Sequence, residues 1–135
     1  MMHAELGGLL VPSLRLKSVG FLHTPKDFRV GPRSIPEFGI VFVYAGRGWS
    51  VQKGVHRRLH GGEIFLIFPG IRYAFATDGA PWDVYWLNFT APPLAAMLKR
   101  FGLTPRDYVR TGCDRECLKR LFEQIVIGVS AAGAS

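Results

Sequence analysis

The sequence has little cysteine and no long apolar stretch. Its only cysteines, Cys113 and Cys117, lie four positions apart, and two thiols without further ligands cannot complete a zinc site. We expect both thiols to be reduced, with a disulfide across one helical turn as the alternative. The apolar run that begins at Ile64 is closed by Pro69 after five residues, whereas a membrane-spanning helix needs about 20. No basic segment precedes the first apolar residues, which argues against a signal peptide. We therefore expect a cytoplasmic protein that does not span a membrane.

The sequence also has no set of histidines suited to a metal. His3 and His23 lie far apart near the N-terminus. His56 and His60 are four residues apart, a spacing that separates two strand residues by about 13 Å. A Gly-x-Ser-x-Gly elbow and a Cys-His arrangement for nucleophilic catalysis are missing as well. We expect no metal, no cofactor and no catalytic residues, and we predict that the protein is not an enzyme.

The excess of basic residues does not form a recognisable nucleic-acid-binding motif. Seventeen Lys and Arg against ten Asp and Glu give a net charge of +7. If the basic residues were clustered on one surface, such a charge would favour DNA binding. The densest basic group, residues 56–60, has no interleaved aromatic residues. No helix-turn-helix pattern is visible. We interpret the charge as a contribution to solubility and as attraction to an anionic partner, in preference to direct DNA contact.

The sequence does contain a series of short strand-like segments. Residues 14–21 alternate between apolar and polar side chains, which is typical of a half-buried strand. Residues 39–44 are β-branched and aromatic, which is typical of a buried strand. Residues 23–38 contain three prolines and are expected to be mostly loop with short edge strands. Regularly spaced short strands predict a sandwich or barrel. Further strands are expected over residues 49–53, 55–60, 64–68, 73–76 and 82–90.

The strand expected at 64–68 is apolar on both of its faces. Gly61-Gly62 precedes it and Pro69-Gly70 ends it, because proline cannot donate to a sheet and glycine permits the turn. A strand without a polar face fits a barrel whose interior is packed or holds a ligand and whose exterior is covered by another element.

The period of the pattern changes after residue 91, and helices are expected from there. Residues 94–101 predict a short helix, and Asp114 is a plausible N-cap for a second one. The second helix has apolar residues at spacings of three and four, which form one face. They are Leu118, Leu121, Phe122, Ile125 and Val129.

Four motifs follow one another in a fixed order between residues 46 and 89, within a resemblance that covers roughly residues 15–127. They are Gly46-x-Gly48 after a strand, Gly62-Glu63 before a hydrophobic strand, Pro69-Gly70 after it, and Trp82-x-x-x-Trp86-x-x-Phe89. In this order they resemble the cupin-type sensing domain at the N-terminal end of AraC-family transcription regulators.

This resemblance implies a mainly β fold. It is a cupin-like (double-stranded β-helix or jelly-roll) barrel over residues 15–91, followed by one or two C-terminal helices over residues 92–135. Residues 1–14 are expected to be a mobile N-terminal arm. The family also has a DNA-binding region of two helix-turn-helix units, which this chain does not contain. We therefore expect the sensing domain of a longer regulator, which contacts DNA only through that further domain.

The resemblance also implies a ligand-binding set. The positions of Arg33, Phe75 and Trp86 line the effector pocket in the family, and we add Tyr73 from its place beside the turn. Where the family often has histidine, this chain has Tyr73, so no role can rest on an imidazole there. We expect a sugar-like or aromatic effector, which stacks on Trp86 and hydrogen-bonds to Arg33.

Other interpretations of the same residues stay open at this point. Trp86, Phe75 and Phe65 would fill the barrel if they met in its centre, leaving a domain that only dimerises. Arg33 would then pair with Glu37 or Asp27 at the surface. A small metal-dependent cupin enzyme, an isomerase or dioxygenase, is the alternative function.

The second helix is expected to make a homodimer. In the family a corresponding helix dimerises, and here the apolar face either packs wholly on the barrel or meets a second copy in part. The arm over residues 1–14 would serve as a lid over a bound effector, or as a disordered terminus.

Overall fold

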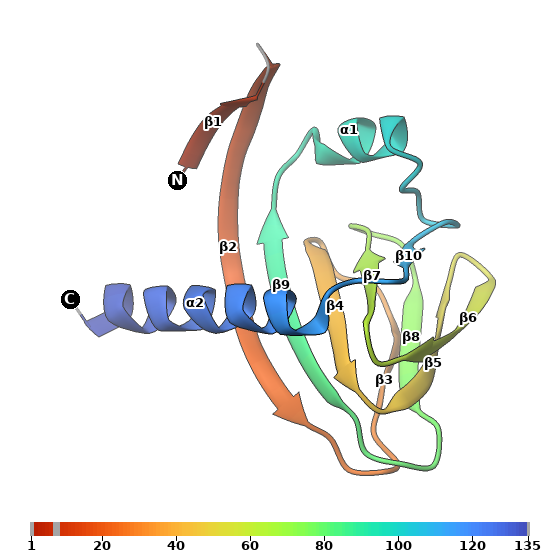
Figure 1. Cartoon of the computed structure of the whole chain (residues 1–135). Helices are drawn as coiled ribbons and strands as arrows, with labels where there is room; N and C mark the ends of the chain where they lie inside the picture. The colour runs from red at the N-terminus through yellow and green to blue at the C-terminus, as the bar shows by residue number, and fades with distance from the viewer. Residues whose placement is uncertain (1, 7–8, 135) are drawn as a thin grey trace.

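The computed structural model describes residues 2–6 and 9–134, with side chains described for residues 14–130. Strands dominate the first two thirds of the chain, and helices follow (Figure 1). The elements are β1 (Met2–Leu6), β2 (Leu9–His23), β3 (Arg29–Arg33), β4 (Phe38–Ala45), β5 (Arg47–Gln52), β6 (Val55–His60), β7 (Glu63–Ile67), β8 (Tyr73–Thr77), β9 (Asp83–Thr90), α1 (Leu94–Arg100), β10 (Val109–Arg110) and α2 (Arg115–Ala134).

The strands form two antiparallel sheets that enclose the core. One sheet has the order β1-β2-β9-β4-β7-β10 and the other has the order β3-β8-β5-β6. Aromatic and β-branched residues from both sheets meet between them, among them Phe38, Val41, Phe65 and Tyr73, each at most 3% exposed. The mainly β barrel that the sequence predicts, with helices at its C-terminal end, is confirmed.

Strand β7 shows why one segment is apolar on both faces. Phe65 points into the interior, where its ring lies 5.3 Å from that of Phe75. Ile64 packs on the opposite side, against the cluster that includes Phe42 and Phe122 of α2. The turn before the strand is ordered by Glu63, whose Oε1 accepts a hydrogen bond from the backbone N–H of His60 at 2.7 Å.

Two strands were not expected from the sequence. The sequence predicts an arm over residues 1–14, but residues 2–6 pair with residues 9–14 in an antiparallel hairpin, so that β2 begins at Leu9 instead of Leu14. Strand β10, at Val109 and Arg110, returns the chain to the edge of the sheet beside β7. Whether residues 1–14 move stays a prediction.

The first two turns of α2 are fastened to the outside of the larger sheet. Asp114 caps the helix, because its Oδ1 accepts a hydrogen bond from the backbone N–H of Cys117 at 3.1 Å. The hydroxyl of Tyr44 donates to Glu116. The ring of Phe122 then stacks on Phe42, with 6.0 Å between the ring centres. The capped start predicted at Asp114 is confirmed.

The remainder of α2 extends past the edge of the sheet formed by β2 (Figure 1). Of the expected apolar face, Phe122 is 5% exposed and Leu118 packs beside it. Leu121 and Val129 are 51% and 42% exposed. The face therefore does not pack wholly on the barrel, because the sheet ends before the helix does.

We predict that Phe122→Ala lowers the free energy of unfolding by about 3 kcal/mol, since a buried ring is lost from the contact between helix and sheet. Urea denaturation measures this. An exposed polar residue of the same helix offers a control, because Gln124→Ala should change the free energy by no more than about 0.5 kcal/mol. Equal effects of the two substitutions would show that Phe122 does not fasten the helix.

Candidate ligand-binding cavity

A cavity of about 190 Å³ lies between the two sheets. Its walls come from β2, β3, β4, β7, β8 and β9, together with the segment before β3. The four residues that the sequence predicts as ligand-binding, Arg33, Tyr73, Phe75 and Trp86, all line it. The other lining residues are Leu22, Phe28, Val30, Val41, Ile67, Val84 and Asn88.

The pairing of β3 with β8 brings two of the predicted residues together. Arg33 lies directly opposite Tyr73 in this antiparallel pair, and Val30 lies opposite Phe75. Opposite residues of such a pair hold their Cβ atoms about 5 Å apart on one face of the sheet. Residues 40 positions apart in sequence therefore become neighbours in the wall of the cavity.

Strand β9 supplies the opposite wall through alternation. Val84, Trp86 and Asn88 are two positions apart, so they point to the same side of the sheet and line the cavity. Asn88 is held there by its Nδ2, which donates to Ser18 Oγ at 3.1 Å.

The position of Trp86 depends on a glycine in the neighbouring strand. Gly20 of β2 lies opposite Trp86, and a Cβ atom added at Gly20 would come within 2.5 Å of the indole ring. Any larger residue would push the indole away. Sequence reasoning missed Gly20, although an isolated glycine inside a strand pattern is a signal of close approach.

The polar part of the cavity is the pair formed by Arg33 and Tyr73. Arg33 Nε donates to the Tyr73 hydroxyl at 2.8 Å, and the guanidinium carbon lies 5.8 Å from the centre of the same ring. Tyr73 is 3% exposed, whereas Arg33 is exposed. Neither Glu37 nor Asp27 forms an ion pair with Arg33 within the described residues. The surface pairing considered from the sequence is therefore not observed.

The aromatic part of the cavity is a row of rings. Tyr73 and Phe75 are stacked, with 6.0 Å between ring centres and 12° between planes. Phe65 and Phe75 do meet in the core, as the closed-barrel interpretation requires. Phe65 does not line the cavity, however, and Trp86 leaves space beside Phe75. The interior is therefore not completely filled.

A buried carboxylate lies close to the arginine. Glu37 is 5% exposed, and one of its oxygens contacts the ammonium of Lys17 on β2. This hydrogen bond holds the pKa of Glu37 below its ordinary value, against the opposing effect of burial, and the charge of Arg33 acts in the same direction. Oε2 of Glu37 has no partner among the described residues.

The histidines lie away from the cavity. His56 and His60 are both exposed on β6, and His60 is 3.8 Å from Glu63. Over residues 2–6 and 9–134, no group of three or more His, Cys, Asp or Glu side chains is arranged to hold a metal ion. The ligand set that a metal-dependent cupin needs is thus missing from the described residues.

Two antiparallel sheets around a ligand-sized interior, with a helix across one sheet, define a cupin-type binding domain. The chain belongs to the family of AraC-like ligand-binding domains, whose family model matches residues 16–135. The resemblance drawn from the sequence motifs is confirmed. A comparison with curated proteins found no match.

Solved structures with the same fold include cupins of several bacteria. An RmlC-like cupin from Shewanella frigidimarina is 14% identical with a TM-score of 0.52, covering 68% of this chain and 96% of the other. A cupin superfamily protein from Desulfitobacterium hafniense is 10% identical with a TM-score of 0.51, covering 60% and 72%. A predicted oxalate decarboxylase from Thermotoga maritima is 15% identical with a TM-score of 0.52, covering 56% and 68%. At these identities the likeness concerns the fold alone.

In the part of the chain that the structure describes, no helix has the length and apolar character needed to cross a membrane.

We predict that Lys17→Met destabilises the protein near neutral pH, because it leaves the buried Glu37 carboxylate unpaired. A carboxyl whose folded-state pKa is lowered stabilises the fold above its unfolded-state pKa of about 4.3. This stabilisation is lost as the pH falls through the lower folded-state pKa. The difference in unfolding free energy between wild type and variant should therefore shrink in acid.

Denaturant titrations over a series of pH values measure that difference. Lys26→Met serves as the control, since Lys26 is exposed and forms no ion pair among the described residues. A Lys17→Met difference that stays constant from neutral pH into acid would contradict the assignment.

Proposed function

We propose that this domain senses a small organic molecule in the barrel cavity and passes its presence to a DNA-binding region of a transcription regulator. One observation carries the proposal: Arg33, Tyr73, Phe75 and Trp86 come from three separate strands and meet around one cavity. A cavity that combines aromatic walls with a few convergent polar groups is the usual form of a ligand site.

The lining indicates the chemistry of the effector. Trp86 and Phe75 offer flat apolar surfaces for a sugar ring or an aromatic ring. The guanidinium of Arg33 uses Nε for Tyr73, so its terminal nitrogens can donate to a carboxylate or hydroxyl of the ligand. The volume of about 190 Å³ is below the range of about 300–1,000 Å³ typical of pockets for drug-sized ligands. A molecule with a single ring, sugar-like or aromatic, fits best.

Strand β9 offers a route from the cavity to α2. Trp86 lines the cavity on one face, while its neighbour Tyr85 packs against Phe122 of α2 on the other, with 5.6 Å between ring centres. A ligand that shifts Trp86 therefore also shifts Tyr85, on which helix α2 packs. The requirement is that the effector binds one arrangement better than the other.

We place the dimer interface on the uncovered part of α2. Leu121 and Val129 remain exposed there, and Phe21 on the nearby strand β2 is 47% exposed. A second copy that covers these residues would bury apolar surface that the barrel does not reach. The lid role of residues 1–14 belongs to the same proposal, and such a regulator acts in the cytoplasm.

A metal-dependent cupin enzyme is the competing function. The fold is shared with a predicted oxalate decarboxylase, but the described residues of this chain offer no metal-ligand cluster. We therefore favour binding without turnover, and propose that the domain needs neither metal nor cofactor.

We predict that the melting temperature rises with a single-ring aromatic acid or a sugar, in a concentration-dependent way that EDTA does not change. A panel of sugars, aromatic acids and divalent metals, each with and without EDTA, tests this by thermal denaturation. A rise with metals alone, abolished by EDTA, would support the enzyme instead.

The compound that stabilises the wild type should lose its effect on Trp86→Ala, because the stacking surface is removed. Trp49→Ala is the matched control, since Trp49 lies outside this cavity under the guanidinium of Arg29, 5.4 Å from its ring centre. Unchanged affinity in a folded Trp86→Ala variant would overturn the assignment of the cavity.

For the dimer, we predict that Val129→Glu shifts the protein from dimer to monomer, because a charge is placed in the apolar contact. Analytical ultracentrifugation measures the mass. Gln124→Glu introduces the same charge at an exposed polar position of α2 and should leave the dimer intact. A wild-type monomer at high concentration, or equal effects of the two substitutions, would contradict the interface.

A further inference from the structure

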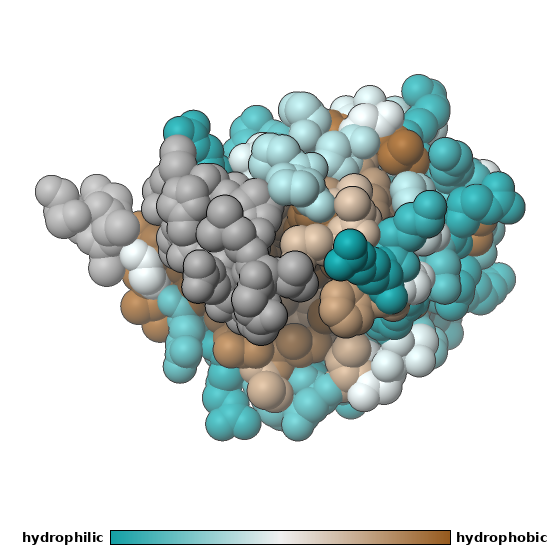
Figure 2. Space-filling model, turned by 90° about the horizontal axis from the view of Figure 1, so that it is seen from above, coloured by the Kyte–Doolittle hydropathy of each residue, from teal (hydrophilic) through white to brown (hydrophobic). Residues whose placement is uncertain are grey.

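A second cavity, separate from the first, lies beneath helix α1 at one end of the barrel. Its volume is about 660 Å³, which falls within the range of about 300–1,000 Å³ of small-molecule sites. Phe38, Phe68 and Ile71 form its apolar floor. It shares no lining residue with the barrel cavity. In the view from above, this end of the molecule shows hydrophobic surface interrupted by strongly hydrophilic atoms (Figure 2).

One wall of this α1 cavity is the helix itself. Ala95, Ala96 and Lys99 lie at spacings of three and four, so they share one face of α1, and all three line the cavity. The helix has no buried side chain. Leu94 and Leu98 pack partly against the core, whereas the exposed face with Ala95, Ala96 and Lys99 borders the open space of the cavity.

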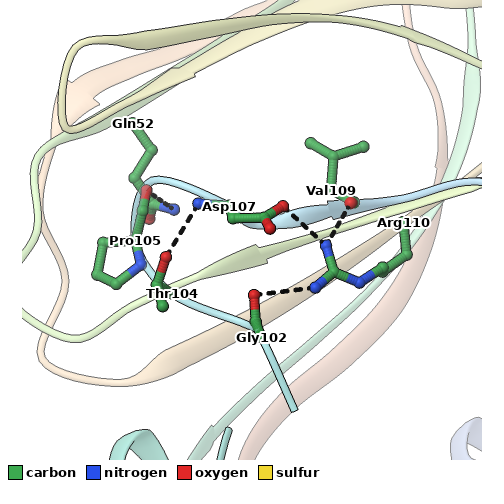
Figure 3. A network of polar contacts seen from close by, with 7 residues as sticks. All are labelled: Gln52, Gly102, Thr104, Pro105, Asp107, Val109 and Arg110. Atoms are coloured by element: carbon green, nitrogen blue, oxygen red, sulfur yellow. Dashed lines mark hydrogen bonds and ion pairs between the residues drawn. The ribbon is translucent and has the colours of Figure 1, made fainter. Parts of the chain in front are cut away.

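The opposite wall is rigidly held by polar contacts (Figure 3). The buried side chain of Gln52 donates to the carbonyl oxygens of Leu66 at 3.1 Å and Pro105 at 3.2 Å. Its Oε1 accepts from the backbone N–H of Phe68 at 3.1 Å. Both Phe68 and Pro105 line the cavity. Gln52 is therefore fully used in fixing the wall, and the space beside it is preformed.

The loop behind this wall is fastened in the same network. Arg110 donates to the carbonyl oxygen of Gly102 at 3.0 Å and to Asp107 at 3.0 Å, and the backbone N–H of Asp107 donates to Thr104 Oγ1 at 3.1 Å (Figure 3). The acidic group of the loop is thereby paired with Arg110. Within the lining, Lys99 is the one charged residue, and the described residues give it no ion-pair partner.

We infer that the α1 cavity binds a free carboxylate with a short apolar tail. The tail would lie on Phe38, Phe68 and the two alanines, and the carboxylate would meet the ammonium of Lys99. An apolar site with a single unpaired cation at its border favours an anion over a neutral or cationic molecule of the same shape. This inference does not depend on the barrel cavity, because the two sites have no residue in common.

Isothermal titration calorimetry of the chain with octanoate, 1-octanol and octylammonium tests the inference. The three probes share a tail and differ in charge. We expect octanoate to bind about three- to fivefold more tightly than 1-octanol, a modest ratio because Lys99 is exposed to solvent. Octylammonium should bind most weakly. Octanol or octylammonium binding as tightly as octanoate, or octanoate failing to bind, would overturn the inference.

Two substitutions locate the probe. Lys99→Met keeps the length of the stem and should remove the preference for octanoate over octanol. Arg100→Met removes a charge from the adjacent residue, which does not line the cavity, and should leave the preference intact. Equal effects of the two variants would show that the general positive charge, and not Lys99, selects the anion.

Ala96→Trp tests the cavity itself. Ala96 is exposed on α1, so the fold should tolerate the ring, which would occupy the space of the tail. Binding of both octanoate and octanol should be lost, with an unchanged circular dichroism spectrum as the check on folding. Retained binding in the folded variant would place the probe elsewhere and overturn the site. If Ala96→Trp does not fold, the comparison of Lys99→Met with Arg100→Met still tests whether Lys99 selects the anion.

Discussion

The antiparallel pairing of β9 between β2 and β4 is the constraint on which the rest of the structure depends. It places Trp86 over Gly20 on the inner face, where the indole becomes a wall of the cavity. It places Tyr85 on the outer face, where the ring supports Phe122 of α2. Because successive side chains of a strand point to opposite faces, the cavity and the helix are coupled through adjacent residues.

The two cavities are built by different means. In the barrel cavity, cross-strand pairs from a regular sheet bring Arg33 to Tyr73. The α1 cavity instead lies between a short helix and an irregular loop, whose backbone groups are satisfied by the side chain of Gln52. The buried amide of Gln52 donates to backbone carbonyl groups and accepts from a backbone N–H. Such an amide fixes an irregular segment as firmly as the hydrogen bonds of a sheet would. Both sites are therefore preformed, although only one is made by strands.

Sequence patterns predicted the regular elements well. The strand expected over residues 55–60 has the bounds of β6, and the helix expected after Asp114 begins at Arg115. Turn residues and alternation act locally, so they can be recognised without knowing the pairing partners. The hairpin of β1 is local, but its residues lack the alternation of apolar and polar side chains that marks a strand. The two residues of β10 could not be recognised, because they pair with β7, which lies far earlier in the chain. The importance of Gly20 was missed for the same reason, since its partner lies 66 residues further along the chain.

The sequence by itself determined a mainly β domain and the order of its strands. Through the family resemblance it also indicated Arg33, Phe75 and Trp86, and through its place beside a turn Tyr73, all of which line the barrel cavity. Side-chain periodicity and turn chemistry are sufficient for the domain class and the strand order, because both are encoded within a few neighbouring residues. Only the tertiary structure decided that the interior keeps an open space, that Arg33 donates to Tyr73 instead of pairing with Glu37, and that α2 extends beyond the sheet it covers. These features depend on volumes and distances between segments far apart in sequence, which local patterns do not encode.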